Sequence, residues 1–492
     1  MDRTCIAVEA MPSYRPYGTI TRLAEKHGVS RQTIYSIAAA AKGILSQSME
    51  PGPHGPRPAP KAIWVDRDRL ERSTVVLTRA GVSQRDIPLC MEGMLDTHLS
   101  PAWVNAELAK REEIAARVNR SWQPTVSETL SGDEIYSNGS PNLLVVGNDS
   151  LYIYALSRQA TCDGETWACV LWDSPDSPQF ASDAGIGLAA GAQQAQVKAH
   201  QLDWDHLLRP LWGQAARLEK QAYAALEAVE ERAAQFEQAQ TPRRLEKHLQ
   251  AWEHLSREAE EKIARTDRFY QLAQQVDAQF ALIDLESGRL RDPLAAAAAL
   301  RTLGEQLGGW QGRIYDKLSS NLIHWADGLF AYHPVLQQAL NPLIQRWGEP
   351  AIQALSRLWQ IEADTKRRPL SLVQRQSQHI LWEQSLDQAL SLLDWEQLPQ
   401  AWEALSQVLN RSWRGSMLAE CVNSLLRPVL AGRKCSDQGC LELFRFLHNS
   451  HRFTRGKRAQ RSPAELAGIQ LPDDPLTLLG LAPKCQSNSP VL

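Results

Sequence analysis

One short segment of the chain has the pattern of β-strands, and the sequence on both sides of it has helical patterns. The segment 131–183 contains the runs DEIYS, NLLVVG, SLYIYALS and QFASD, separated by turn residues and by one helix-like stretch, DGETWACVLWD. Short runs rich in β-branched and aromatic residues, bounded by Gly, Asn and Asp, are typical of strands. QFASD is followed by AGIGLAAGAQQAQ, a helix punctuated by glycine. The sequence therefore predicts three strands, a helix, a fourth strand and a helix within a largely helical chain.

Length and composition place the chain among multi-domain globular proteins. It has 492 residues, of which 43% are apolar and 22% are charged, so it can form several domains with real cores. The first residues, MDRTCIAVEA, lack the pattern of a signal peptide, and no stretch reaches the roughly 20 apolar residues that span a bilayer. The eight cysteines are scattered without a CxxC pair, which favours free thiols. We therefore expect a soluble, cytoplasmic protein.

Charge is distributed unevenly along the chain. Lys and Arg exceed Asp and Glu over residues 1–130 and again over 411–492, whereas the middle is acidic and the net charge of the whole is −3. Basic ends suit contacts with DNA, and an acidic middle suits a divalent-metal site. Ordinary surface variation explains the same distribution equally well, so charge alone leaves both interpretations open.

Residues 19–42, TITRLAEKHGVSRQTIYSIAAAAK, have the pattern of two helices joined by a short turn. Gly28 ends the first helix, and Ser30 is a good N-cap for the second. This order is the helix-turn-helix pattern, whose second helix enters the major groove of DNA. The side chains expected to meet base edges are Arg31, Gln32, Thr33 and Tyr35. A plain helical hairpin has the same spacing and stays the alternative.

A second helical unit follows a Pro/Gly-rich segment. Residues 49–61, MEPGPHGPRPAPK, exclude helix and central strand and are expected to form a linker. Residues 62–125 then have the pattern of three helices, the last of which begins at Ser100-Pro101. The phrase AGVSQRDI in this unit resembles a degenerate helix-turn-helix. A second DNA reader and a domain that serves only for packing both fit this pattern.

Three acidic residues, far apart in the chain, stand in contexts that suit a metal site at the edge of a sheet. Asp133 lies in the first strand, in GDEIYS, and Asp183 ends the fourth strand, in SDAGIGLAAG. Glu420 lies much later on a predicted helix, RGSMLAECVNSLLRPVL, and Asn423 and Arg427 follow it on the same helical face. That face could direct accessory groups at metal and phosphate together. Taken alone, Glu420 would be a solvated glutamate of a helix.

These stretches resemble the DDE-type transposases and integrases of the ribonuclease H-like superfamily, in particular bacterial insertion-sequence transposases. The resemblance implies that the first and fourth strands are neighbours, that Asp133 and Asp183 lie side by side, and that Glu420 completes a catalytic metal-binding triad. The stretch QLDWDHLLRPL is similar to a further element of several such families, an Asp or Cys shortly before a His. It implies accessory roles for Asp203 and His206, although packing at a helix start is an equal alternative for His206.

The residue types fit the chemistry of cutting and joining DNA. Hydrolysis of a phosphodiester adds charge to an anionic phosphorus, and two Mg²⁺ or Mn²⁺ ions roughly 3.5–4 Å apart activate the attacking oxygen and stabilise the leaving one. Such hard cations prefer carboxylate oxygens. The same site could first use water and then a 3′-hydroxyl as the attacking group, without a covalent protein intermediate.

A large helical insertion is expected between the second aspartate and the glutamate. Residues 204–410 are far more than such a core needs, and they begin with two long amphipathic helices rich in Ala, Glu, Gln and Leu. Helical inserts at this point are similar in architecture to those of hAT-type transposases. The insert is rich in Trp, most of which should lie in its core. One Trp could stack on a base at the cleaved DNA end, but the sequence does not identify it.

The C-terminal region is basic. LHNSHRFTRGKRAQRSPAELAG (447–468) resembles the tail of many bacterial transposases, with a Ser-Pro pair that opens a final helix. The residues expected to neutralise DNA phosphates are Arg455, Lys457, Arg458 and Arg461. Cys435, Cys440, His448 and His451 are spaced more closely than zinc-finger ligands and are expected to serve the fold and the surface near DNA.

The expected architecture is an α/β ribonuclease H-like catalytic core interrupted by a large all-α insertion and preceded by all-α helix-turn-helix domains. Its parts are a helix-turn-helix (1–48), a linker (49–61), a second helical DNA-binding unit (62–125), the first part of the core (126–203), the all-α insertion (204–410), the second part of the core (411–450) and a basic tail (451–492). The expected function is DNA transposition by a nucleoid-associated homo-oligomer, at least a dimer, on element ends and target DNA. A catalytically silent DNA-binding regulator derived from a transposase and a ribonuclease H-like nuclease are the alternatives.

Overall fold

The computed structural model describes residues 3–11, 18–49, 65–237, 241–367, 372–432 and 437–483. The chain divides into two compact units, Met1–Val65 and Asp66–Leu492. All but the first residue of the predicted linker lies outside the described residues. Among the helices of the described ranges, none combines the length and the apolar character needed to cross a membrane.

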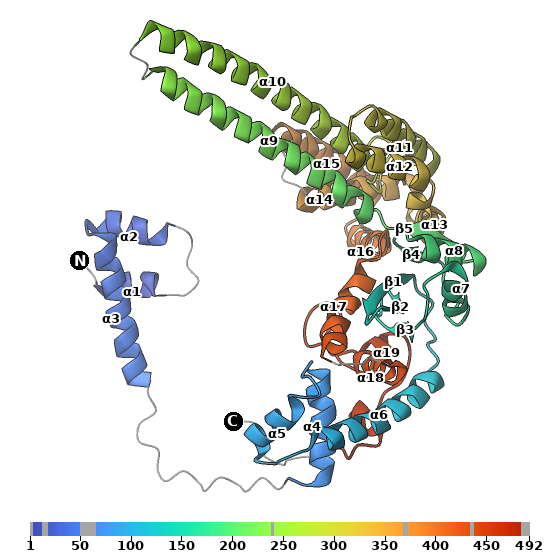
Figure 1. The fold of residues 1–492 in the computed structure, drawn as a ribbon. Coiled ribbons are helices and arrows are strands. Elements are labelled where there is room, and N and C mark those ends of the chain that lie inside the picture. Colours follow the sequence, from blue (N-terminus) through green and yellow to red (C-terminus); the bar gives the residue numbers. More distant parts are fainter. Residues whose placement is uncertain are drawn as a thin grey trace. The chain divides into compact units, whose positions relative to one another are not determined.

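The first unit is a cluster of three helices, α1 (Arg3–Ala10), α2 (Thr19–His27) and α3 (Arg31–Met49) (Figure 1). Gly28 ends α2 with a left-handed φ of 66°, and the Ser30 hydroxyl accepts a hydrogen bond of 3.1 Å from the Thr33 amide at the start of α3. Both helix boundaries were predicted from these residues. The short helix α1 was not predicted; it adds Ile6 and Ala10 to a core that includes Ile20, Leu23 and Ile34.

The second unit contains one five-stranded mixed sheet, of β1 (Leu130–Ser137), β2 (Ser140–Gly147), β3 (Ile153–Arg158), β4 (Phe180–Ser182) and β5 (His200–Leu202). The strand order is β3-β2-β1-β4-β5. The first three strands form an antiparallel meander, and β4 and β5 join β1 in parallel. The sequence predicted four of these strands and missed β5, which is too short for a recognisable period.

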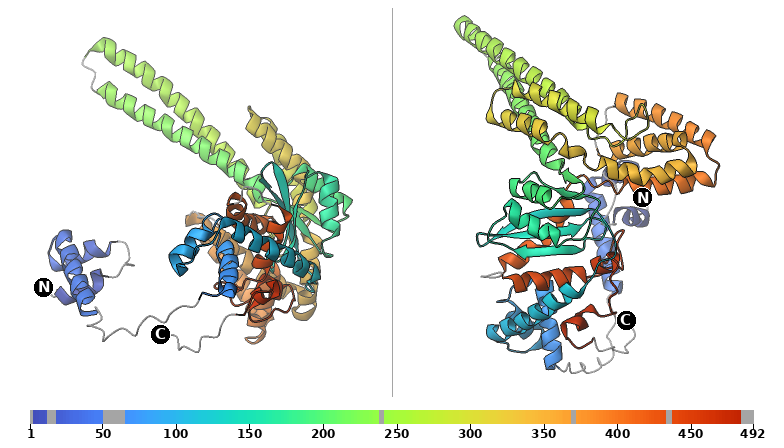
Figure 2. Two further views of the ribbon diagram at one scale, coloured as in Figure 1. Left: turned by 60° about the horizontal axis from the view of Figure 1, so that its bottom comes forward. Right: turned by 90° about the vertical axis from the view of Figure 1, so that its right-hand side faces the viewer.

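Helices cover both faces of the sheet (Figure 2). On one face, α7 (Gly164–Trp172) and α8 (Ile186–Gln194) form an apolar layer in which Trp167 and Phe180 are buried. On the other face, α17 (Met417–Ala431) covers Ile135 and Leu144, and α18 (Gln438–Asn449) contacts β3. The chain thus leaves the sheet after β5, contacts Gln201 of β5 again through Leu329 and Tyr332, and returns to cover a face of the sheet at α17.

The intervening residues form one helical part with a continuous core. Its elements are α9 (Asp205–Glu237), α10 (Pro242–Ala278), α11 (Pro293–Gly308), α12 (Arg313–Trp325), the 3-10 helix η1 (Gly328–Phe330), α13 (His333–Trp347), α14 (Glu349–Arg367), α15 (Leu372–Leu392) and α16 (Gln397–Leu409). The first two form a long antiparallel hairpin (Figure 1). Most of its tryptophans pack against this core, whereas Trp395 is 80% exposed. The protein therefore has an α/β sheet core with a large helical part.

The helices α4 (Arg67–Arg79), α5 (Ile87–Leu95) and α6 (Pro101–Ser121) share an apolar core with the C-terminal region. α6 packs along α18, and the 3-10 helix η2 (Pro475–Leu479) packs on α6. Arg111 of α6 is 1% exposed, pairs with Glu71 and Glu107, and donates to the Leu479 carbonyl. These helices are therefore built into the body that carries the sheet.

The segment predicted as a basic tail differs in the structure. Ser462 and Glu465 form a reciprocal capping box at α19 (Pro463–Leu466), which confirms the predicted Ser-Pro helix start. Ala464 and Ala467 are buried in the apolar layer beneath the sheet. Because these residues and η2 bury apolar side chains, residues 451–483 are folded onto the body.

Candidate functional site

Asp133 and Asp183 lie side by side on neighbouring parallel strands. In the β1–β4 ladder, Gly132 pairs with Ser182, so each aspartate is the next residue beyond the last pair. Neighbouring strands are roughly 4.8 Å apart, and residues at equal positions of parallel strands point to the same face. The predicted adjacency of the two aspartates is therefore confirmed.

Strand alternation turns Asp133 toward α17. Ile135, two residues later on β1, packs against this helix, so Asp133 shares its face. Asn423 of α17 donates a hydrogen bond of 2.8 Å to Asp133 Oδ2, and the Glu134 amide donates one of 2.9 Å to Oδ1. Asn423 is 1% exposed. The contact fixes the orientation of the carboxylate and links β1 to a helix that follows it by nearly 300 residues.

Glu420 lies in the first turn of α17, one turn before Asn423. His206 Nε2 is 3.4 Å from Glu420 Oε1, and Arg209 Nη2 is 3.9 Å from Oε2. Both side chains come from the first turns of α9, which begins the helical part. The insert therefore contributes directly to the surroundings of Glu420, and the side chain of His206 faces the site rather than the insert core.

The electrostatics of Asp133 reflect its acidic surroundings. Burial, together with the weaker effect of the negative charges of Asp183 and Glu420 and against the hydrogen bonds from Asn423 and the Glu134 amide, raises the pKa of Asp133 to about 6. Burial also raises the pKa of Glu134 to about 7, with contributions from the charges of Asp183 and Asp133. Asp133, Glu134 and Asp183 thus repel one another, and a divalent ion would neutralise this repulsion.

The donor set fits a hard divalent cation. Carboxylate oxygens are the ligands that Mg²⁺ and Mn²⁺ prefer. Asn423 Oδ1 is buried and has no hydrogen-bond partner among the described residues, so an oxygen acceptor beside Asp133 is unsatisfied. In the described ranges, no group of three Asp, Glu, His or Cys side chains lies close enough to hold a metal ion. The residue types fit such an ion, and Asp133, Asp183 and Glu420 would have to move closer together to share one.

Asp203 has a different place from the one implied by its sequence context. It is 2% exposed, and its Oδ2 accepts hydrogen bonds from the amide and the hydroxyl of Ser416, at 2.8 and 2.9 Å. Its Oδ1 accepts a third from the Asp205 amide. His206 Nε2 is 4.0 Å away. Both carboxylate oxygens of Asp203 therefore accept hydrogen bonds inside the protein. Through this clasp, Asp203 links the segment before the helical part to the segment after it and fixes the start of α17.

Arg427 follows Glu420 on α17 but is exposed, whereas Asn423 between them is buried. The sequence predicted that Glu420, Asn423 and Arg427 share one face of this helix. Of these three, Glu420 and Asn423 contact other residues of the site. Arg427 is free to reach a ligand from outside.

The predicted DNA-reading side chains occupy the start of α3. Arg31, Gln32 and Tyr35 are exposed, and the half-buried Thr33 is held by Ser30. The other face of α3 is anchored by the fully buried Ile34. The start of a second helix thus presents Arg31 and Gln32 at the surface.

The basic residues after α18 divide into two groups. Arg458 donates hydrogen bonds to the Asn148 and Asp149 carbonyls, at 2.9 and 2.7 Å, and so holds the turn between β2 and β3. The sequence predicted that Arg458 contacts DNA phosphate, whereas in the structure its guanidinium group bonds to these backbone carbonyls. Arg455, Lys457 and Arg461 are exposed, and the Lys457 ammonium lies 5.6 Å from the centre of the Trp413 ring.

Several neighbours of the site were missed from the sequence. Glu134 directly follows Asp133, but alternation along a strand places it on the opposite face. His200 of β5 bonds to the Ser182 hydroxyl at 2.7 Å, and burial lowers its pKa to about 4, so it is neutral. Arg209 lies one helical turn after Asp205. An acidic neighbour in GDEIYS was a usable signal, whereas His200 and Arg209 come near the site only through folding.

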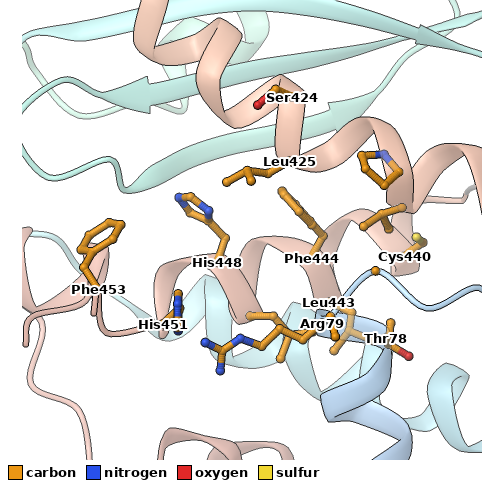
Figure 3. Close-up of a pocket in the computed structure, with 15 residues that line it drawn as sticks. Thr78, Arg79, Ser424, Leu425, Cys440, Leu443, Phe444, His448, His451 and Phe453 are labelled. Atoms are coloured by element: carbon orange, nitrogen blue, oxygen red, sulfur yellow. The ribbon is translucent and has the colours of Figure 1, made fainter. Parts of the chain in front are cut away.

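A separate cavity of about 430 Å³ lies between α4, α17 and α18 (Figure 3). Leu425, Phe444, Leu447 and Phe453 give it a mostly apolar wall, with Arg79 and His451 at its border. His448 bonds to the Leu151 carbonyl at 2.9 Å, and Cys440 is buried, so neither is an open metal ligand. Cys435 lies outside the described residues.

Two comparisons of the sequence with known proteins give no relative on which to base a role. The sequence matches no family model, and no curated protein is significantly similar to it. The residues of the site and their geometry therefore carry the functional interpretation.

Proposed function

We propose that this protein is a DNA transposase of the DDE type, which binds the ends of a DNA element and catalyses metal-dependent strand cleavage and strand transfer. The observation that carries the proposal is the placement of Asp133 and Asp183 at neighbouring strand positions, beside the helix that carries Glu420 and whose Asn423 bonds to Asp133. Carboxylates gathered at one edge of a sheet suit a pair of divalent ions that act on a phosphodiester.

The fold supports the same proposal. A five-stranded mixed sheet in which the first and fourth strands are neighbours, with helices on both faces, is compatible with a ribonuclease H-like core. The helical part inserted before α17 is compatible with the interrupted core of such enzymes. The N-terminal helix-turn-helix supplies a reader for duplex DNA.

The chain's own residues have distinct tasks in this proposal. Asp133, Asp183 and Glu420 would hold two Mg²⁺ or Mn²⁺ ions, which supply activation of the attacking oxygen and stabilisation of the leaving one. Asn423 orients the Asp133 carboxylate, and His206 orients Glu420. Correct orientation matters because metal ligands act only within a narrow range of geometry.

DNA would be held at several places. On α3, the exposed residues Arg31, Gln32 and Tyr35, with Thr33, would contact base edges and nearby backbone. Arg455, Lys457 and Arg461 would neutralise phosphates, which gives a binding strength that falls with salt. Acting on two ends requires a homo-oligomer, at least a dimer on DNA.

The proposal is tested with a supercoiled plasmid that carries the coding segment with its native flanking DNA. The purified protein is incubated with Mg²⁺ or Mn²⁺, and excised and joined products are mapped by sequencing. Asp133→Asn, Asp183→Asn and Glu420→Gln are each expected to lower product formation at least about 10³-fold, because each removes a metal ligand. Asp173→Asn, at an exposed position directly after α7, is the matched control and should keep activity.

Each contrary outcome has a clear meaning. Variants that cut and join like the parent would show that the three carboxylates are not the site. Cutting without joining and without preference for particular ends would favour a ribonuclease H-like nuclease. Sequence-specific binding without any cutting by the parent protein would favour a silent DNA-binding regulator.

A further inference from the structure

A polar groove of about 580 Å³ lies in the helical part, between α10 and the turn that follows α11. Its lining side chains are two arginines, several glutamines, one leucine and one tryptophan, namely Arg265, Arg268, Gln271, Leu272, Gln275, Gln306, Trp310 and Gln311. The two arginines and the first two glutamines follow one another at helical spacing along one face of α10. Nothing in the proposed catalytic site accounts for this groove.

An aromatic platform holds one of the arginines in place. The Arg265 guanidinium lies 5.5 Å from the centre of the Trp310 ring and 5.8 Å from that of Tyr315. Phe269, which is fully buried, packs edge-on against both rings. Tyr315 is 3% exposed, and its hydroxyl accepts a hydrogen bond of 2.7 Å from Gln214. The platform is therefore part of the insert core, and the cation on it is pre-organised.

The charge of the groove is not compensated within the protein. No acidic side chain lines it, and none of the ion pairs among the described residues involves Arg265 or Arg268. Lys262 on the same helix pairs with Glu258 at 2.7 Å, which is the usual arrangement on this surface. Acidic residues outnumber basic ones over residues 204–410. Arg268 donates to the Ala264 carbonyl, but neither guanidinium group has an ionic partner among the described residues, and such a pair of cations would attract an anion.

We propose that this groove binds the phosphodiester backbone of duplex DNA. Guanidinium groups donate paired hydrogen bonds to phosphate oxygens, and glutamine amides donate to phosphate and sugar oxygens without selecting a base. The inference rests on the proposed function for its choice of DNA, since a free phosphate or a nucleotide shares the same chemistry. It gives the helical part a role in holding substrate.

The test measures binding of the full-length protein to a labelled duplex over a series of salt concentrations. Arg265→Gln/Arg268→Gln is expected to weaken binding at least about tenfold and to reduce the slope of log affinity against log salt by about 2, since each lost phosphate contact contributes roughly 0.9. Arg243→Gln/Arg244→Gln removes the same charge from exposed positions of the same helix outside the groove and should have a much smaller effect. Trp310→Leu should weaken binding and Trp310→Phe should retain most of it.

The outcomes separate the sources of the anion and the two proposals. If both double variants lose the same affinity for duplex DNA, the groove is not the binding site, because affinity then depends only on overall charge. A small anion would be the ligand of the groove if two results were found together. Inorganic phosphate or a mononucleotide would bind at the groove, and Arg265→Gln/Arg268→Gln would bind duplex DNA as tightly as the parent. Asp133→Asn should keep groove-dependent binding while losing cleavage. If the parent protein does not cleave DNA, the salt slopes of the two double variants still show whether the groove binds DNA.

Discussion

At the scale of single residues, the site contains an acidic group, Asp133, whose burial beside other acids lowers the stability of the folded protein. Asp133 is ionisable, largely buried and close to two other acids, and its carboxylate is held by Asn423. Such a group costs stability in its charged form, so its place is better explained by binding than by folding. Asp203 is the opposite case, because three internal donors satisfy its acceptors.

The first prediction concerns the pH dependence of the metal-free protein. Because folding raises the pKa of Asp133 from 3.8 to about 6, the folded state binds this proton more tightly, and stability falls as pH rises between those values. Asp133→Asn removes the penalty and should raise the free energy of unfolding by roughly 1–3 kcal/mol at pH 7.5, with little change at pH 4. Urea unfolding in EDTA measures both. A variant less stable than the parent at pH 7.5 would contradict the assigned burial of charge.

The second prediction concerns the clasp formed by Asp203. Asp203→Asn replaces one acceptor oxygen with an NH₂ group that must face a donor, so we expect a loss of about 2–3 kcal/mol in the free energy of unfolding. Ser416→Ala removes only the hydroxyl contact and should cost about 1 kcal/mol. Asp205→Asn is a control that should stay within about 1 kcal/mol. Equal stabilities of Asp203→Asn and this control would exclude a structural role for the clasp.

At the scale of elements, the crossing of α7 and α8 sets the direction in which the chain leaves β4. α8 begins three residues after Asp183, and glycine permits its close approach to α7. A Cβ atom at Gly191 would lie 2.3 Å from the Cβ atom of Trp167. The Gly-punctuated pattern of AGIGLAAG predicted a helix, but its packing partner could not be identified from the sequence.

The third prediction tests this crossing. Gly191→Ala should force the two helices apart and lower the free energy of unfolding by about 2–3 kcal/mol, despite the better helix propensity of alanine. Gly213 of α9 has nothing within 4 Å of such a Cβ atom, so Gly213→Ala should be neutral or stabilise by up to about 1 kcal/mol. Thermal and urea unfolding compare the pair. If both substitutions stabilise, the close helix contact does not exist.

At the scale of the second unit, the helical part is joined to the sheet core at a neck, where the insert begins and ends, and also at β5, whose Gln201 bonds to Leu329 and Tyr332. The Arg414 guanidinium lies 4.5 Å from the centre of the Trp204 ring and also donates to the Phe280 carbonyl. The Trp204 amide donates to the Arg414 carbonyl at 3.4 Å. Since the start and the end of the insert meet here, the sheet core could close without it.

The fourth prediction follows from that neck. Replacing residues 205–412 with a short Gly/Ser linker should leave a folded core of β1–β4, because the apolar clusters that include these strands contain no described residue of α9–α16, while β5 loses its contacts with Leu329 and Tyr332. Cleavage should fall at least about tenfold, since His206 and Arg209 no longer hold Glu420. Circular dichroism and amide hydrogen exchange report the fold, and the plasmid assay reports activity. Failure of the shortened protein to fold would show that the insert core is needed by the sheet.

The sequence by itself determined the local structure and the candidate acids. Strand patterns, glycine and serine boundaries and helical periodicity depend on neighbouring residues, so four of the five strands and the helix-turn-helix boundaries followed from them. The adjacency of Asp133 and Asp183 was predicted through a resemblance, and the β1–β4 ladder confirmed it.

Only the tertiary structure decided which groups meet across long separations. It places α17, with Asn423 and Glu420, beside β1, and it pairs Asp203 with Ser416. It also shows that Arg458, which was predicted to contact phosphate, bonds to the turn between β2 and β3. These contacts depend on sheet order, helix packing and the closure of an insert at its neck. Local propensities do not encode them, because their partners lie hundreds of residues away.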